Sequence, residues 1–165
     1  MAEIRATTAE LFSRTVNRLP HFPVSSLRPT QERTLTILLQ GQDCLAILPT
    51  GAGKSLIYSI FPYLLMEMEP EMKYYCLVIS PLKALIADQV KAFRDQGLSC
   101  VGLLPKEEMP DGDLEGFCQG EYNLVISSPE ALLDDGELGM QYEHCLKKLN
   151  ICLITYDEAH VIREW

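Results

Sequence analysis

Short apolar runs alternate along the chain with longer segments of helical spacing. The runs are typical of strands buried on both faces and span residues 44–48, 74–79, 100–104, 124–126 and 151–156. Between them, apolar residues recur at the spacing of one helix face, which predicts helices that cover a sheet. Strands that alternate with helices favour one α/β domain, with a largely parallel sheet and helices on both of its faces.

The helical spacing is clearest in four segments. We expect an amphipathic helix before Pro20, a second that closes near Gly41, a third over residues 54–68 and a fourth over residues 82–93. Pro62 is expected to kink the third helix or to lie in its first turns. In the fourth, the side chains expected to point inward are Leu82, Leu85, Ile86, Val90 and Phe93.

Polar segments separate the predicted strands and helices. The dipeptides Ser80-Pro81 and Ser128-Pro129 each follow a strand, and serine before proline is expected to cap the helix that comes next. Residues 105–119 predict a loop with one helical turn at its end, and residues 134–137 predict a solvated connection.

Composition limits the function. A chain of 165 residues that is 47% hydrophobic can bury one sizeable core. Its 14 basic and 23 acidic residues give a formal net charge of −9. This charge argues against binding of nucleic acid through a broad positively charged surface. Any contact with a polynucleotide must therefore be local.

The cysteines and the apolar stretches indicate the compartment. The six cysteines form no C-x-x-C pair, so we expect buried, reduced thiols in an intracellular protein, with neither a disulfide framework nor a zinc site. The uncharged stretch at residues 55–66 is too short to span a membrane. No targeting signal is expected, because residues 2–19 lack an apolar core and include Glu3 and Glu10.

A glycine-bearing turn, Leu48 to Ser55, joins the first apolar run to the third helix. A strand that feeds a helix through such a turn presents free N–H groups and the positive end of the helix dipole to an anion. Gly51 and Gly53 let the backbone approach phosphate, Lys54 can reach the terminal phosphates, and the Ser55 hydroxyl can bind Mg²⁺. An ordinary strand-to-helix turn is the alternative, but it requires neither the lysine nor the hydroxyl.

Two adjacent carboxylates, Asp157 and Glu158, follow the last apolar run. Open parallel sheets place their chemistry at this end of a strand. Beside a phosphate site, Asp157 can bind the metal and Glu158 can orient the attacking water. The pair alone is typical of a loop start, but together with the glycine turn it predicts a nucleotide-hydrolysing centre. His160 is a candidate sensor of the γ-phosphate, although a lone histidine is usually structural.

Other polar residues are weaker candidates. The Gln31 amide can read an adenine, and Phe22 or Arg28 can cover a base, although an exposed helix residue is the plainer interpretation of Gln31. The helix starts at Ser80 and Ser128 can bind phosphates of a polynucleotide, with Lys83 adding a positive charge. Helix capping alone explains both serines.

These motifs together resemble the first RecA-like domain of a superfamily 2 helicase of the DEAH type. Residues 48–55 and 157–160 are similar to its two ATPase motifs. Three further stretches narrow the resemblance to the RecQ family: residues 27–31 resemble its adenine-reading motif, 80–90 its motif Ia, and 128–130 its motif Ib. Arg163-Glu164-Trp165 is similar to the start of that family's aromatic-rich loop.

The resemblance implies a role for each matched residue. It implies that ATP is bound by Arg28, Gln31, Thr50, Gly51, Ala52, Gly53, Lys54 and Ser55. It implies Mg²⁺ on Ser55 and Asp157, catalysis by Lys54, Asp157, Glu158 and His160, and DNA contacts from Ser80, Lys83, Ser128 and Trp165.

The sequence departs from the family pattern in three places. Val24 stands where the family usually has an aromatic residue, and Tyr156 ends the last strand where a small or apolar residue is more typical. The chain also stops at Trp165, before the strand that in this family inserts between the phosphate-turn strand and the carboxylate strand. We therefore expect a fragment, with a lead-in at residues 1–26 and a partial domain at 27–165, whose sheet lacks a central member.

The implied function is ATP-dependent, 3′ to 5′ unwinding of DNA in repair or recombination, with single-stranded and duplex DNA as partners. The expected location is nuclear, or cytoplasmic in a prokaryote. The second RecA-like domain with its arginine is absent from this sequence, so we expect the chain alone to bind nucleotide without brisk hydrolysis or unwinding. An RNA-directed helicase of the same superfamily and a catalytically inert interaction module are the alternatives.

Overall fold

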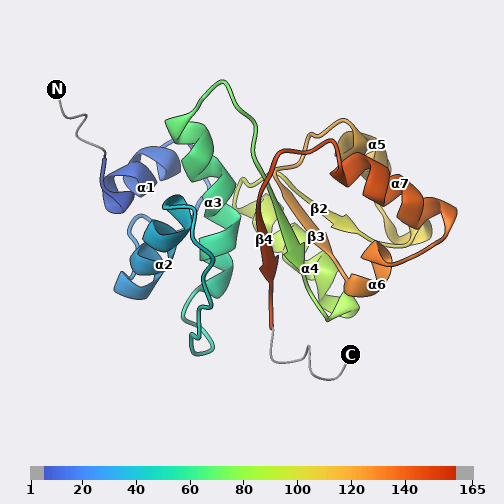
Figure 1. Cartoon of the computed structure of the whole chain (residues 1–165), viewed down its shortest axis with the longest axis horizontal. Coiled ribbons are helices and arrows are strands. Elements are labelled where there is room, and N and C mark those ends of the chain that lie inside the picture. The colour runs from blue at the N-terminus through green and yellow to red at the C-terminus, as the bar shows by residue number, and fades with distance from the viewer. Residues whose placement is uncertain (1–5, 159–165) are drawn as a thin grey trace.

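Four parallel strands form the centre of the molecule. In the computed structural model, which describes residues 6–158, the strands lie in the order β2-β3-β1-β4 (Figure 1). Their bounds are β1 Tyr75–Ile79, β2 Cys100–Leu103, β3 Leu124–Ser127 and β4 Ile151–Tyr156. All three strand pairings are parallel, which confirms the predicted fold class.

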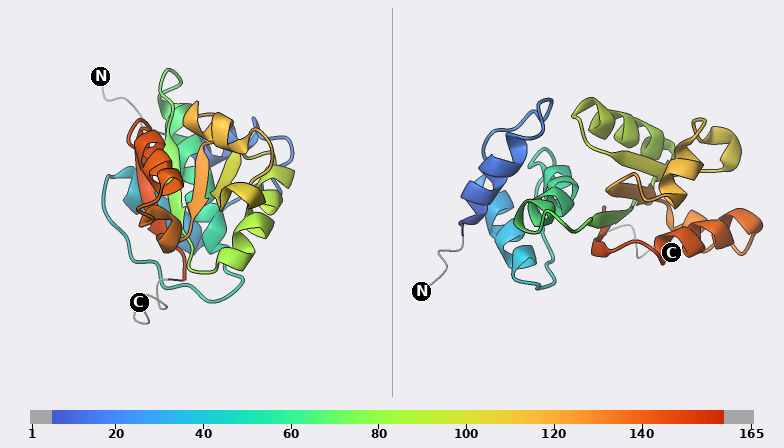
Figure 2. Two further views of the ribbon diagram at one scale, coloured as in Figure 1. Left: turned by 90° about the vertical axis from the view of Figure 1, so that its right-hand side faces the viewer. Right: turned by 90° about the horizontal axis from the view of Figure 1, so that it is seen from above.

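The two faces of the sheet bury alternate residues of β1, β2 and β3, whereas the edge strand β4 is only partly covered. Cys76 and Val78 of β1 pack with α4 (Lys83–Asp95), whereas Leu77 between them packs with α5 (Asp113–Cys118) and α7 (Glu137–Leu146). Seen from above, α4 and α7 lie on opposite sides of the strands (Figure 2). The continuous apolar runs of the strands therefore follow from burial on both faces.

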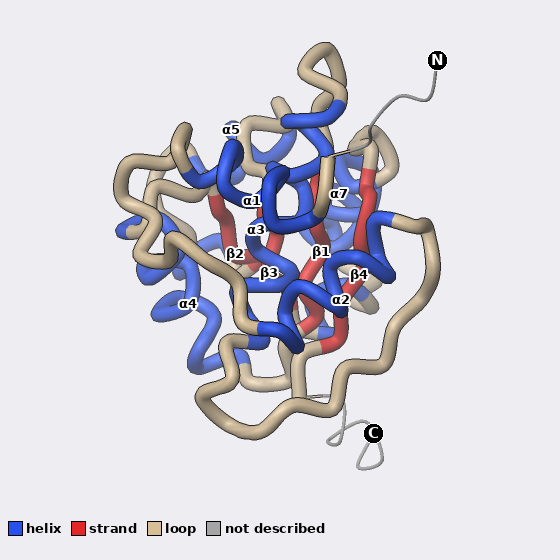
Figure 3. Tube along the Cα trace, turned by 90° about the vertical axis from the view of Figure 1, so that its left-hand side faces the viewer, coloured by secondary structure: helices blue, strands red, loops and turns tan. Residues whose placement is uncertain are grey.

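A second layer of helices lies outside α3 (Lys54–Met68). In Figure 3, α1 (Thr8–Val16) and α2 (Pro29–Leu39) lie in front of α3. Leu11 and Phe12 of α1 and Leu35 of α2 share one buried cluster with residues of α3. Because α1 packs in this cluster, the lead-in shares a core with the rest of the chain. The helix α3 is buried on several sides, as its apolar pattern predicts, and it continues through Pro62.

The predicted strand at residues 44–48 is wrong. These residues are a loop between α2 and α3, and Leu45 and Ile47 are 80% and 87% exposed. A strand needs a neighbour to satisfy its backbone groups. The nearest strand, β4, lies across a groove from this loop, so residues 44–48 have no hydrogen-bonding partner there.

The two Ser-Pro dipeptides differ in what they do. Ser128 caps α6 (Pro129–Leu132), and its hydroxyl accepts a hydrogen bond from the Ala131 N–H at 3.3 Å, as predicted. Ser80 caps nothing, since α4 begins only at Lys83; its N–H instead extends the sheet by donating to the Ser127 carbonyl at 2.9 Å.

The late start of α4 also changes its inward face. Leu82 and Leu85 are 49% and 45% exposed, contrary to the prediction, and the buried stripe consists of Ile86, Val90 and Phe93.

The C-terminal half adds two features that the pattern did not predict. The helix α7 was not expected, and Cys145 on it forms a disulfide with Cys118 at the end of α5, where the Cα atoms are 5.1 Å apart. The expectation of reduced thiols is therefore wrong for this pair, because packing of α5 against α7 brings them together. Cys76 and Cys100 are buried as expected, and burial raises the pKa of Cys100 to about 12, whereas Cys44 is exposed.

The remaining short element is the 3₁₀ turn η1 (Lys106–Glu108), within the predicted loop. Among the described residues, no helix combines the length and apolar character needed to cross a membrane.

Candidate functional site

The glycine turn enters α3 in the conformation that the sequence predicts. Gly51 and Gly53 both adopt the left-handed region, with φ of +79° and +78°, and α3 begins directly after Gly53 at Lys54. A Cβ on Gly53 would lie 2.4 Å from the Gln31 Nε2 atom. The left-handed backbone conformation thus favours glycine at this position, and a Cβ there would displace the end of the Gln31 side chain.

Side chains at the start of α2 donate hydrogen bonds to the backbone of the glycine turn. Arg28 Nη1 donates to the Gly51 carbonyl at 2.8 Å, and Gln31 Nε2 donates to the carbonyls of Ala52 and Gly53, each at 3.2 Å. Gln31 Oε1 accepts from the Arg28 N–H at 2.9 Å, and the residue is only 3% exposed. The Gln31 amide, which was expected to read adenine, is instead hydrogen-bonded to the backbone of the glycine turn.

The end of β4 delivers the acidic pair. The Asp157 N–H continues the sheet by donating to the Ile79 carbonyl at 3.0 Å, and the chain then turns at Glu158, a residue with a φ of +53°. The Glu158 N–H donates to Asp157 Oδ1 at 3.1 Å. Both carboxylates therefore lie at the carboxyl edge of the sheet, as predicted for chemistry in a parallel α/β fold.

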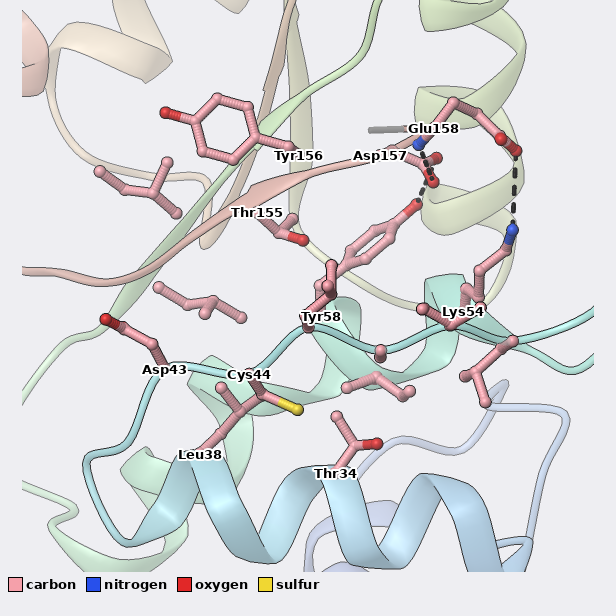
Figure 4. Close-up of a pocket in the computed structure, with 17 residues that line it drawn as sticks. Thr34, Leu38, Asp43, Cys44, Lys54, Tyr58, Thr155, Tyr156, Asp157 and Glu158 are labelled. Atoms are coloured by element: carbon pink, nitrogen blue, oxygen red, sulfur yellow. Dashed lines mark hydrogen bonds and ion pairs between the residues drawn. The ribbon is translucent and has the colours of Figure 1, made fainter. Parts of the chain in front are cut away.

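One face of α3 meets this acidic pair. Lys54 Nζ lies 3.8 Å from Glu158 Oε1, and one turn further along the helix the Tyr58 hydroxyl donates to Asp157 Oδ2 at 3.5 Å. Figure 4 shows both α3 side chains directed at the acidic residues, whereas Tyr156 points away. The structure thus brings together the lysine of the phosphate turn and the carboxylates that follow β4.

Two hollows flank the glycine turn. The larger, of about 670 Å³, is a groove between residues 43–48 and β4, and Lys54, Asp157 and Glu158 lie in it. The smaller, of about 250 Å³, is lined by residues that include Phe22, Val24, Arg28, Gln31 and Ser55. The larger one falls in the size range of small-molecule sites, roughly 300–1,000 Å³.

The donor set suits a hard divalent cation. Ser55 and Asp157 offer a hydroxyl and a carboxylate, the oxygen ligands that Mg²⁺ prefers. Within residues 6–158 no cluster of three or more His, Cys, Asp or Glu side chains forms a metal cage.

Comparison with known proteins decides the family. The model of the DEAD/DEAH box helicase family matches residues 28–165. This chain belongs to the DEAD/DEAH box helicases. Among individual members of the family, it is 33% identical over 147 residues to the probable ATP-dependent DNA helicase RecS of Bacillus subtilis and 35% identical over 140 residues to the ATP-dependent DNA helicase RecQ of Synechocystis.

The similarity covers most of this chain and a small part of each relative. The alignments take in 87% and 84% of the chain, but only 27% of either bacterial helicase. The ATP-dependent DNA helicase Q4 of Mus musculus is 30% identical over an alignment of 167 positions, which covers all of this chain and 13% of that protein. These relatives confirm the resemblance to RecQ-type DNA helicases.

Three of the four predicted DNA-contacting residues, Ser80, Lys83 and Ser128, lie at the carboxyl edge of the sheet. Ser80 follows β1 and Ser128 follows the neighbouring β3, but both residues are buried, and the Ser128 hydroxyl is occupied as a cap. Lys83 at the start of α4 is exposed. His160 and Trp165 lie outside the described residues.

Tyr58 is the residue of this site that sequence reasoning missed. Its position four residues after Lys54 places it on the same helix face, which was a usable signal. The apolar pattern of α3 concealed it, because a tyrosine in such a helix is usually core. Its pKa is raised by burial, and further by the neighbouring Asp157 carboxylate.

Proposed function

We propose that the chain is the ATP-binding half of an ATP-dependent DNA helicase of the RecQ type. The observation that carries the proposal is the meeting of the phosphate turn and the acidic pair, with Lys54 Nζ at 3.8 Å from Glu158 Oε1. Sequence similarity to named DNA helicases supports the choice of nucleic acid.

Each residue of the site has a distinct role in this proposal. The glycine turn and Lys54 bind the β- and γ-phosphates of ATP, and Ser55 with Asp157 would bind Mg²⁺. The chemistry that Mg²⁺ would supply there is neutralisation of the charge that develops on the phosphates. Glu158 orients and polarises the attacking water.

The ion pair between Lys54 and Glu158 bears on how the site takes up a phosphate. The side chains are 34% and 39% exposed, so water screens the pair, and exposed pairs contribute only about 0–1 kcal/mol. Lys54 can therefore exchange Glu158 for phosphate at little cost. The exchange frees Glu158 from the lysine at the moment when a phosphate arrives.

The smaller hollow is the proposed site of the adenine base. Phe22 and Arg28 line it beside Gln31, so an apolar ring and a guanidinium are both available to cover the base. Val24, which replaces the aromatic residue usual in the family, lines the same hollow. Phe22 thus lies where it can supply the missing aromatic surface.

Translocation along single-stranded DNA in the 3′ to 5′ direction requires a second domain that closes on the nucleotide. An arginine supplied from elsewhere can contribute about 10³–10⁵ to the rate in P-loop enzymes. This chain spans 13 to 27% of the relatives named above, so hydrolysis and unwinding belong in the proposal to a larger assembly.

The test is a nucleotide titration of the 165-residue chain in the presence of Mg²⁺, with a fluorescent ATP analogue. Lys54→Ala is expected to weaken binding at least about tenfold, because hydrogen bonds to charged groups contribute roughly 1.5–3 kcal/mol. Lys91→Ala, which removes an exposed lysine from α4, is the matched control and should bind like the wild type. Equal, negligible binding by the wild type and Lys54→Ala would favour an inert interaction module.

A further inference from the structure

The α3 face that meets the acidic pair carries two different groups. Lys54 and Tyr58 are one helical turn apart, and their partners Glu158 and Asp157 are consecutive. The cation faces Glu158, whereas the neutral phenol faces Asp157 (Figure 4). The second contact uses a donor that adds no charge near the carboxylate.

Packing fixes the phenol in place. Tyr58 is 5% exposed and belongs to the core cluster beneath α4, where its ring meets the Phe93 ring edge-on at 6.1 Å between centroids. Among the described residues, Asp157 is the sole hydrogen-bond partner of its hydroxyl. A buried hydroxyl needs such a partner, so the phenol directs its donor at Asp157.

The Asp157 carboxylate receives a donor on each oxygen. Oδ1 accepts from the Glu158 N–H at 3.1 Å, and Oδ2 accepts from Tyr58 at 3.5 Å. Each carboxylate oxygen has two lone pairs, so both oxygens keep one for a metal ion or its water. The two donors together restrict rotation of the carboxylate without using up its ligand capacity.

We propose that Tyr58 is a positioning residue that orients the Asp157 carboxylate for nucleotide-bound Mg²⁺. The inference rests on the proposed function, since it deepens the role given to Asp157. The 3.5 Å separation is long for a hydroxyl–carboxylate hydrogen bond. Hydrogen bonds in active sites are often long without substrate and tighten in the complex.

The experiment measures how much Mg²⁺ the 165-residue chain needs to bind a fluorescent ATP analogue. Tyr58→Phe preserves the packed ring and removes only the hydroxyl. We expect its Mg²⁺ requirement to rise roughly three- to tenfold, as for the loss of one hydrogen bond. Its nucleotide affinity in EDTA should equal that of the wild type, because the phosphate turn is unchanged.

Tyr63→Phe is the matched control. Tyr63 lies on the same helix, and its hydroxyl accepts a hydrogen bond from the Ser99 N–H at 2.7 Å, away from the acidic pair. This variant also loses a bonded hydroxyl, but it should leave the Mg²⁺ requirement unchanged. Tyr58→Met gives a second side chain without the hydroxyl, so the test does not depend on one variant folding.

A double substitution separates orientation from general packing. In an Asp157→Asn background, Tyr58→Phe should add no further increase in the Mg²⁺ requirement, whereas independent effects would multiply. Wild-type binding with the same Mg²⁺ requirement in Tyr58→Phe and Tyr58→Met overturns the inference alone. Failure of the wild-type chain to bind nucleotide at any Mg²⁺ concentration overturns the proposed function and the inference with it.

Discussion

Gln31 uses its whole side-chain amide on backbone groups. Its oxygen accepts from Arg28, and its nitrogen donates to the carbonyls of Ala52 and Gly53. The sequence predicts a nucleotide-binding role for Gln31, and the structure places its amide in contact with the glycine turn. The three hydrogen bonds were not predictable, because they depend on how α2 packs against α3.

Gln31→Ala should therefore lower the free energy of unfolding by about 1–3 kcal/mol, since it removes the three hydrogen bonds that the buried Gln31 amide makes with the backbone. The measurement is urea denaturation of both chains. Gln40→Ala, at the exposed end of α2, is the control and should change stability by less than about 0.5 kcal/mol. Equal effects of the two substitutions would show that the hydrogen bonds of Gln31 to the glycine turn do not stabilise the fold.

At the scale of elements, most helices and strands follow from spacing alone. Residues 54–68 form the predicted helix to the residue, and the runs in β1, β2 and β3 are strands covered on both faces, whereas the edge strand β4 leaves Ile154 and Tyr156 exposed. The run at 44–48 has the same composition but no neighbouring strand, and local pattern does not reveal that difference. The missed helix α7 and its disulfide also depend on tertiary packing.

The exposed run gives an element-scale prediction. Ile47→Lys should change the free energy of unfolding by no more than about 0.5 kcal/mol, because the side chain is 87% exposed. Val125→Lys in the fully buried strand β3 should abolish folding or cost several kcal/mol. Urea denaturation and near-ultraviolet circular dichroism measure both. A large loss with Ile47→Lys would mean that residues 44–48 form a buried strand after all.

The disulfide between α5 and α7 gives a second prediction at the scale of elements. The bond joins residues 27 apart, so its reduction should lower stability by about 2–4 kcal/mol. Thermal melts of the wild type with and without dithiothreitol measure this change. Cys118→Ser should melt like the reduced wild type and be insensitive to dithiothreitol; a wild type indifferent to the reductant would contradict the pairing.

At the scale of the whole molecule, the acidic net charge does not conflict with the proposed binding of nucleic acid. Such binding needs only one edge of the sheet. The acidic pair, Ser80 and Ser128 all follow strand ends at that edge, and Lys83 is an exposed cation there. The overall charge of −9 does not supply affinity for a polynucleotide. In the proposed function, affinity for a polynucleotide would come from exposed groups at this edge, such as Lys83.

The 165-residue chain alone should separate no strands of a duplex. Its proposed partner domain, with the arginine that accelerates hydrolysis, lies outside this sequence. A fluorescence unwinding assay with a 3′-tailed duplex and ATP measures this directly. Strand separation that depends on ATP and is lost in Lys54→Ala would contradict the division of the enzyme into two necessary halves.

The central claim is that the glycine turn and the acidic pair, which lie far apart in the sequence, form one Mg²⁺-nucleotide site. Calorimetric titration with a non-hydrolysable ATP analogue and Mg²⁺ tests it most directly, comparing the wild type with Asp157→Asn and with Asp43→Asn, a control that alters another acidic residue lining the same groove. We predict that Asp157→Asn loses at least about tenfold in Mg²⁺-dependent affinity and that Asp43→Asn binds like the wild type. Undiminished, Mg²⁺-dependent binding by Asp157→Asn would contradict the account.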